Sequence, residues 1–515
     1  MASKGSPRRG AGRKKNDRPT KVIRVDEQLA IAIRQAIKTH SLQDILAALA
    51  TLESNENQGE DSDIVSAEPI SETCDGNLNA DQQKANDALM EWWHQNKKSA
   101  SLSGAAGTGK TYTIGYWIKA LKAIAEISPI FVTPTHKAKK VLKAFLAKAN
   151  VKAEVYTIAQ ALGKQPIIND EGAEDFQNQG KSNFIQGASL VICDEASMVA
   201  KDDYQEILDS CTRVLWLGDR YQLPPVGEDV SPAFQADPTT ELTQVMRYTG
   251  HILAECEKLR TAVDRRIIYR PQPDGKSVMA MRRGDGIKLA VRLFKSPKFD
   301  ADSSFCRLLA FRNARVDSCN KTLKRLIYGH CQPFFLGQKL IASRPVTRLV
   351  ASQDDKGRRR VEWQILATNS EEMEVVGEIV QRAIDPDDLA HAPKLCQSLS
   401  GTITTFECLS ESGTIFQSLI LHKDAAESRQ EHFTIAKTSW DKKAMQFLYG
   451  WGDELKDIFA LTVHKGQGSS FNHVFVDIED ILRRSSHAKP GQKDMRPQML
   501  YTAFSRASER VYILF

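Results

Sequence analysis

The sequence predicts an α/β protein: two domains with parallel sheets, an inserted, mainly β subdomain in the second, and a small helical module near the N-terminus. Three observations lead to this class. Short β-rich runs alternate with amphipathic helices in two separate blocks. Several of these strands run into glycine-rich or acidic turns, as strands of parallel sheets do where they bind ligands. With 515 residues, 41% of them hydrophobic, the chain has the material for more than one core.

The first block, residues 78–248, begins the alternation of strands and helices. Its strands are short and apolar, and the helices between them carry apolar residues at helical spacing. This order is typical of a parallel sheet covered by helices. We expect strands at 99–103, 129–133, 189–193 and 213–217 and helices at 111–125 and 136–149.

The second block, residues 249–515, repeats the pattern with an interruption. The segment from about 332 to 455 carries β-type runs at 361–366 and 374–380 and no motif of a parallel sheet, so we expect an inserted, mainly β subdomain there. On either side of it, we expect strands at 307–311, 458–463, 473–478 and 510–515 and a helix at 316–328.

Residues 1–24 form a basic arm. Of the net charge of +6, nine Lys and Arg against one Asp give this arm +8, which leaves −2 for the rest of the chain. The arm can therefore neutralise phosphates of duplex DNA or contact a protein partner, whereas the charge says little about the body of the chain.

Residues 25–52, with an alternating strand at 21–25, form a small strand–helix–helix module. This order resembles a ribbon-helix-helix unit, a dimeric DNA-binding module. A basic tail with a helical hairpin for self-association or partner docking is the other interpretation. Residues 53–77 are acidic and polar with almost no apolar periodicity, so we expect a flexible linker before the first block.

Composition also bears on the compartment. The chain has no run of about 18 apolar residues, and its first residues are basic and polar rather than a charged stub before an apolar core. We therefore expect a soluble, unsecreted protein without a membrane partner. The nine cysteines are scattered and form no C-x-x-C pair, which argues against a disulfide framework and against a zinc site. A reducing, cytoplasmic compartment fits best.

Residues 104–111 read GAAGTGKT and match G-x-x-x-x-G-K-[ST] in full, between a predicted strand and a predicted helix. Such a loop curls backbone N–H groups around phosphate oxygens at a helix N-terminus. Lys110 would reach the β- and γ-phosphates of ATP, and Thr111 would ligate Mg²⁺. A chance glycine-rich turn is the other interpretation, which the flanking strand and helix disfavour. The residues expected to hold the nucleotide here are Gly104, Gly107, Thr108, Gly109, Lys110 and Thr111.

Two later strands end in motifs that complete a site for phosphoryl transfer. After the strand at 189–193, Asp194 can hold Mg²⁺ while Glu195 orients and deprotonates the attacking water. After the strand at 213–217, the motif GDRYQLPPV places Gln222 where it can hydrogen-bond the γ-phosphate and respond to its loss. Each motif alone could be a solvated strand end or a rigid turn, but their order behind a phosphate-binding loop favours ATP hydrolysis.

Together these motifs resemble those of superfamily 1B DNA helicases, the Dda and RecD group, over roughly residues 78–515. The resemblance implies two RecA-like P-loop motor domains. It implies that Gln82 reads the adenine, although Asn79 stands where Thr is usual. It also implies that Thr135 and His136 grip single-stranded DNA, as does Thr157 in the next motif, where Ala159 replaces a common His.

In the second half, the resemblance assigns three more sets of residues. Arg247 in LTQVMR and Arg506 in LYTAFSRA would act as fingers that neutralise the transferring phosphoryl group across an interdomain cleft. The motif TVHKGQG at 462–468 would link nucleotide and DNA through His464 and Lys465. Residues 163–186 occupy the position of a duplex-splitting hairpin in this group. Phe176 could stack on a base there, with Phe184 as a second aromatic, or both could pack against the motor.

The resemblance therefore implies an ATP- and Mg²⁺-dependent helicase that travels 5′→3′ on single-stranded DNA and unwinds forks, in DNA replication, recombination or repair. Two alternatives stay open. One is a translocase that strips proteins without strong unwinding. The other is a sequence-specific DNA-binding protein in which the N-terminal module finds the site and the ATPase acts as a switch.

Overall fold

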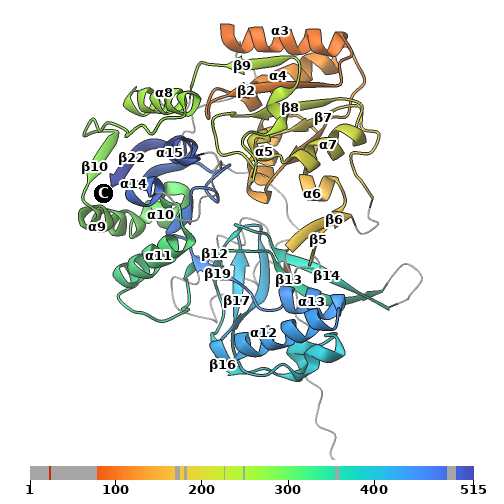
Figure 1. Ribbon diagram of the computed structural model, residues 1–515, viewed down its shortest axis with the longest axis vertical. Coiled ribbons are helices and arrows are strands. Elements are labelled where there is room, and N and C mark those ends of the chain that lie inside the picture. Colours follow the sequence, from red (N-terminus) through yellow and green to blue (C-terminus); the bar gives the residue numbers. More distant parts are fainter. Residues whose placement is uncertain are drawn as a thin grey trace, which may run out of the picture.

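The computed structural model describes residues 23–24, 78–168, 174–178, 182–225, 227–246, 250–353, 359–483 and 494–515 (Figure 1). The module expected at 25–52, the linker at 53–77 and the basic arm, apart from Ile23–Arg24, lie outside these residues. In the part of the chain so described, no helix is both long and apolar enough to cross a membrane.

The first domain is built on a six-stranded sheet in which every neighbouring pair is parallel. Its strands, in spatial order, are β4 (Glu154–Thr157), β3 (Ile130–Thr133), β7 (Val191–Cys193), β8 (Val214–Gly218), β2 (Ser99–Gly104) and β9 (Thr239–Leu242). Its helices are α3 (Ala80–His94), α4 (Lys110–Lys122), α5 (His136–Lys148), α6 (Ile158–Ala161) and α7 (Lys201–Ser210). The four strands predicted here form within two residues of their expected bounds, and β4 and β9 are additional edge strands.

Alternation along the strands explains why both faces of this sheet are covered. On β8, Leu215 and Leu217 join the core on one side, whereas Val214 and Trp216 join the core on the other. Side chains of successive strand residues point to opposite faces, so an apolar run without polar breaks must be buried on both. Trp92 of α3 and Trp117 of α4 pack against each other in the first of these cores.

The second domain has a five-stranded, wholly parallel sheet. Its spatial order is β10 (Val278–Met281), β22 (Ala507–Leu514), β21 (Phe471–Asp477), β11 (Cys306–Ala310) and β20 (Ala460–Thr462). The helices around it are α8 (Gly250–Arg265), α9 (Arg283–Phe294), α10 (Pro297–Ala301), α11 (Asn313–Tyr328), α14 (Ile478–Leu482) and α15 (Arg496–Phe504). Strand β10, which the sequence did not indicate, forms one edge.

The insertion between α11 and β20 forms an antiparallel sheet of its own. The order is β18 (Thr414–Leu421), β17 (Thr402–Ser410), β15 (Glu372–Val375), β12 (Lys339–Ala342) and β19 (Leu455–Asp457), with β16 (Val380–Ala383) also on β17 and β1 (Ile23–Arg24) along β18. A separate hairpin joins β13 (Val346–Gln353) and β14 (Arg359–Ala367). The single β run expected at 374–380 is therefore two strands, β15 and β16.

Two helices of the insertion were not predicted, α12 (Lys423–Thr438) and α13 (Lys442–Gly450). They pack on the sheet through Ala425, Met445 and Leu448, which share a buried cluster with Ile403. Alanines and polar residues dominate α12, so its apolar stripe is narrow, and the packed sheet rather than the local pattern stabilises it.

Within the segment 163–186, the backbone forms a hairpin of β5 (Lys164–Ile168) and β6 (Glu174–Asn178). The hairpin leaves the first domain after α6 and contacts α13 of the insertion, as the view in Figure 1 shows. This hairpin is therefore one of the places where the first domain meets the insertion.

Candidate nucleotide site and interdomain cleft

The phosphate-binding loop joins β2 to α4. Gly107 and Gly109 take left-handed backbone conformations, with φ of 83° and 80°. A Cβ on Gly109 would lie 2.5 Å from Gln82 Nε2, so an added side chain would displace the end of Gln82, and the positive φ by itself favours glycine. Lys110 Nζ donates to the carbonyls of Gly104 at 2.7 Å and Ala105 at 3.0 Å, which holds the ammonium over the loop where phosphate oxygens would replace those carbonyls.

Gln82, expected to read the adenine, lies buried in the first turn of α3 against this loop. Its Nε2 donates to the Thr108 carbonyl at 3.4 Å. Asn79 is the N-cap of the helix, and its side chain accepts from Gln82 N at 2.8 Å while Gln82 Oε1 accepts from Asn79 N at 3.2 Å. Asparagine thus supplies the cap that Thr would supply, so the departure at position 79 leaves the placement of Gln82 intact.

The paired carboxylates follow β7. Asp194 N donates to the Val132 carbonyl at 2.9 Å, and its Oδ1 accepts from Glu195 N at 2.8 Å. Glu195 has a left-handed φ of 55°, uncommon for a residue with a side chain and typical of sites where the backbone is held for function. Burial and the Glu195 charge raise the pKa of Asp194 to about 6, against the effect of Lys110. A carboxylate that is costly to charge, beside a lysine and a second carboxylate, fits a Mg²⁺ ligand, because the cation would favour its charged form.

Two buried polar atoms on opposite domains have no partner among the described residues. Gln222 is 4% exposed; its Nε2 lies 3.4 Å from Asp219 Oδ2, but its Oε1 is unpaired. Arg506, 3% exposed, donates from Nη1 to the Ser469 carbonyl at 3.2 Å and from Nη2 to Ser505 Oγ at 3.1 Å, and its Nε is unpaired. These unpaired atoms leave Gln222 and Arg506 able to form a further hydrogen bond.

The motif containing Gln222 binds the second domain directly. Tyr501 Oη donates to Asp219 Oδ2 at 2.6 Å. Leu223 N donates to Thr502 Oγ1 at 3.2 Å, and Gln467 Nε2 donates to the Leu223 carbonyl at 3.0 Å. These three contacts are buried, so the loop that would sense the γ-phosphate is attached to both nucleotide-facing motifs of the second domain.

Gly468 lies close to Glu195, the expected catalytic residue, and to Thr135, an expected DNA-binding residue. Its φ is +69°, and a Cβ placed on it would lie 3.9 Å from Glu195 Oε1, 4.0 Å from Thr135 Oγ1 and 3.7 Å from Ala138 Cβ. The turn after β20 therefore abuts the candidate catalytic carboxylate and the start of α5 at the same point.

The residues expected to bind DNA differ in how far their side chains are exposed and in the hydrogen bonds that they already form. Thr135 caps α5, and its Oγ1 accepts from Ala138 N at 3.2 Å. His136 beside it is half-buried, and its pKa is lowered by burial and by the charge of Lys139, against a smaller effect of Glu371. Thr157 is 3% exposed and its hydroxyl caps α6, so a DNA contact by Thr157 stays a prediction that its burial disfavours.

On the second domain, His464 and Lys465 follow β20. Burial lowers the pKa of both side chains, and Lys465 Nζ donates to the Ser343 carbonyl of the insertion at 3.1 Å. The His464 ring lies 6.4 Å from that of Phe311, at the end of the neighbouring strand β11. Both rings are partly exposed, so together they offer a surface on which a base could stack.

Two expected site residues cannot be placed. Arg247 and the side chain of Phe176 lie outside the described residues, although the backbone of Phe176 pairs with Pro166 in the β5–β6 hairpin. Phe184 is not part of the hairpin strands. Its ring stacks on Tyr156 of β4 at 5.1 Å, so it packs against the first domain.

The contacts made by Gln467, Tyr501 and Thr502 were missed, although the residues stand inside motifs that the sequence displays. Nothing in the sequence singles out the residues that join the insertion to the motor: Arg307 and Glu372, whose side chains are 0% and 10% exposed and whose Nη2 and Oε1 lie 2.8 Å apart. Their pairing depends on the fold of the insertion.

Two family models match parts of the chain. Residues 77–266 match the family model of an AAA domain, and residues 457–514 match that of a UvrD-like helicase C-terminal domain. An uncharacterised protein of Acanthamoeba polyphaga mimivirus is 26% identical over 509 residues, covering 84% of this chain and 99% of that protein. The ATP-dependent DNA helicase dda of Enterobacteria phage T4 is 27% identical over 281 residues, covering 52% of this chain and 62% of that helicase.

Among solved structures, the Pif1 helicase from Candida albicans is 16% identical with a TM-score of 0.41, over 85% of this chain and 94% of that one. The Bacteroides Pif1 helicase in complex with ADP-AlF3 and ssDNA is 16% identical with a TM-score of 0.40, over 85% of this chain and 92% of that one.

Proposed function

We propose that the chain is a superfamily 1B helicase, an ATP-dependent DNA helicase that travels 5′→3′ on single-stranded DNA and unwinds duplex at forks, and its matches to an AAA domain, a UvrD-like helicase C-terminal domain and the dda helicase support this. The observation that carries the proposal is the meeting of Glu195, Thr135 and Gly468 at one point of the interdomain contact. The proposed catalytic base, the proposed DNA-gripping threonine and the turn of the second domain would therefore be neighbours, so that a movement of one would displace the others.

The chain's own residues divide the chemistry between the two domains. Lys110 would exchange the carbonyls of Gly104 and Ala105 for phosphate oxygens, since an ammonium can satisfy either set. Thr111 and Asp194 would hold Mg²⁺, and Glu195 would accept the proton of the attacking water. When bound, MgATP supplies the phosphoryl group whose transfer drives the cycle.

Closure of the cleft would bring Arg506, and by the resemblance Arg247, to the γ-phosphate. Arg506 would turn its unpaired Nε and its fork from Ser469 toward the phosphoryl oxygens. Gln222, attached to the second domain through Leu223 and Asp219, would transmit the loss of that phosphate. Alternate gripping by Thr135 and His136 on one domain and by His464 and Lys465 on the other would convert closure into steps along the strand.

The β5–β6 hairpin favours unwinding over translocation alone. It leaves the first domain after α6 and contacts α13 through β5, and it occupies the position in the sequence where the resemblance implies a duplex-splitting hairpin. We infer that it forms the wedge, with Phe176 as the residue that would meet the fork.

ATP hydrolysis in the presence of oligo(dT) tests the first part of this proposal. Lys110→Ala is expected to lower the DNA-stimulated rate by at least about 100-fold, because it removes a charge preorganised for the transferring phosphate. Glu195→Gln should still bind ATP and DNA but hydrolyse at a similarly low rate. Lys119→Ala, an exposed lysine on the same helix, is the matched control and should leave the rate unchanged. Normal hydrolysis by the Lys110 variant would refute the assignment.

Unwinding of duplexes with either a 5′ or a 3′ single-stranded tail tests polarity. The proposal expects unwinding from the 5′ tail. Unwinding from a 3′ tail alone would overturn the direction, whereas DNA-stimulated hydrolysis without unwinding of either substrate would favour a translocase that displaces proteins.

A further inference from the structure

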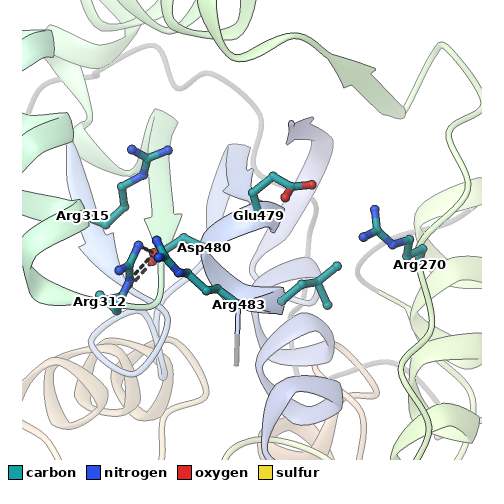
Figure 2. Close-up of a pocket in the computed structure, with 7 residues that line it drawn as sticks. Arg270, Arg312, Arg315, Glu479, Asp480 and Arg483 are labelled. Atoms are coloured by element: carbon teal, nitrogen blue, oxygen red, sulfur yellow. Dashed lines mark hydrogen bonds and ion pairs between the residues drawn. The ribbon is translucent and has the colours of Figure 1, made fainter. Parts of the chain in front are cut away.

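A pocket of about 460 Å³ lies at the carboxyl edge of the second parallel sheet, where β11 and β21 end. Four arginines line it, Arg270, Arg312, Arg315 and Arg483, together with the carboxylates of Glu479 and Asp480. In Figure 2, Arg270 reaches the pocket from one side, and Arg312, Arg315 and Arg483 lie on the other. We name this the arginine pocket.

The buried carboxylates of the pocket are already saturated. Asp480 accepts from the backbone N–H groups of Phe311 and Arg312, each at 2.9 Å, and from Arg312 Nε at 2.6 Å. Behind it, Asp477 Oδ2 pairs with Arg315 Nε at 2.7 Å and with Arg283 Nη1 at 2.6 Å. Asp477 and Asp480 fix the direction of Arg312 and Arg315. Glu479, the other carboxylate of the lining, is exposed and adds a second negative charge, so the four lining arginines exceed the two lining carboxylates.

Arg270 and Arg483 are exposed and form no ion pair with any residue whose position the structure gives. They belong to different segments, one after α8 and one after α14, and they face the same space from two sides. In Figure 2 the Glu479 carboxylate lies between the two sides, so the pocket is lined by four arginines and two carboxylates. This excess of positive charge favours an anion, and planar guanidinium forks match the oxygens of a phosphate. No aromatic side chain is among the described residues that line the pocket, so it suits a phosphate group rather than a base.

The position of the pocket indicates which molecule would supply the bound phosphates. Strand β11 runs directly from its last residue, Ala310, into Phe311 and Arg312. Phe311 faces His464 across 6.4 Å, and Arg312 turns into the pocket. Phe311 and Arg312 are consecutive residues, so the pocket begins next to the His464–Phe311 pair, and a strand of DNA held at that pair would continue toward the pocket.

We propose that the arginine pocket binds backbone phosphates of single-stranded DNA beyond the strand segment gripped by His464 and Lys465. This inference rests on the proposed function and extends it: the pocket lengthens the footprint on the second domain, so that the strand stays attached while the first domain releases it. The pocket recognises phosphate, so its binding is independent of base sequence.

Binding of labelled oligo(dT) of two lengths to the full chain tests this site. The pair of lengths is about 8 and about 16 nucleotides, within the range of single-strand sites. The variant is Arg270→Ala with Arg483→Ala, both exposed, so folding should be unaffected. The matched control is Lys288→Ala with Lys423→Ala, whose side chains are 80% and 90% exposed and which removes the same charge elsewhere.

We expect the arginine variant to bind the longer oligonucleotide about five- to tenfold more weakly than the control at low salt, and the shorter one equally well. Its slope of log affinity against log salt for the longer oligonucleotide should fall by about 0.7 for each phosphate that the variant no longer neutralises. Equal affinities of variant and control for the longer oligonucleotide would overturn the site. A loss of affinity of the same size for both oligonucleotides would also overturn it, because the arginines would then belong to the DNA site at His464 and Lys465. If the unmodified chain bound neither oligonucleotide, the proposed function itself would fail.

Discussion

Glu372 joins the three parts of the molecule, and its replacement by glutamine gives the sharpest test of how they are held. The residue begins β15 of the insertion. Its Oε1 accepts from Arg307 Nη2 of the second domain at 2.8 Å and lies 3.6 Å from Lys137 Nζ on α5 of the first domain. Ser303 donates to its other oxygen. Both cations also lie over the ring of Phe471, Lys137 Nζ at 5.6 Å and the Arg307 guanidinium at 5.1 Å.

The magnitude follows from the pKa of this carboxyl. Burial by itself would raise the pKa of Glu372, but Arg307, Lys137 and Ser303 lower it from 4.5 to about 2. A difference of that size between the unfolded and folded states corresponds to about 3 kcal/mol of stability. The folded pKa is depressed, so this stability is fully present above the unfolded pKa near 4.5 and is lost as the pH falls toward 2. Glutamine removes it and leaves Arg307 buried without a counter-charge.

Urea unfolding at neutral pH and near pH 3.5 measures this contribution. At neutral pH, Glu372→Gln should lower the free energy of unfolding of the transition that includes the insertion by about 3 kcal/mol. Near pH 3.5 the difference from the unmodified chain should narrow by about 1.4 kcal/mol, because the carboxylate has by then lost part of its advantage. Glu378→Gln, an exposed glutamate of the same insertion, is the control and should stay within about 0.5 kcal/mol. The reasoning is refuted if the two variants unfold alike at neutral pH, or if the difference does not narrow in acid.

Two further substitutions test the contact between the motor domains. Tyr501→Phe removes the buried hydroxyl that donates to Asp219 at 2.6 Å and should cost about 1.5–3 kcal/mol in urea unfolding; an unchanged midpoint would contradict the contact. Gly468→Ala forces a side chain into a left-handed position beside Glu195, so stimulation of ATP hydrolysis by single-stranded DNA should fall while ATP binding persists. Gly329→Ala introduces the same backbone strain at a helix end with open space around it, and it should leave that stimulation intact; equal behaviour of the two glycine variants would count against coupling through Gly468.

Short-range patterns determined much of the architecture and the nucleotide motifs. The two parallel sheets follow from apolar runs buried on both faces, and the loop at Gly104–Lys110 follows from glycines that alone accept its backbone angles. Asp194, Glu195 and Gln222 stand at strand ends, where a parallel sheet gathers its ligand-binding residues. Such features repeat over a few residues, so they can be read before the chain is folded.

Partnerships between distant segments were decided only by the tertiary structure. Helix α12 has a weak apolar stripe and forms because a sheet already offers it a surface, and the burial of Thr157 as the cap of α6 is likewise visible only in the folded chain. The arginine pocket joins a loop after α8, the end of β11 and the helix after β21, which no local pattern relates. No local sequence pattern marks Glu372. Its ion pairs with Arg307 and Lys137 form only when three separate elements pack together and exclude water, because the attraction between two charges grows as the local dielectric constant falls.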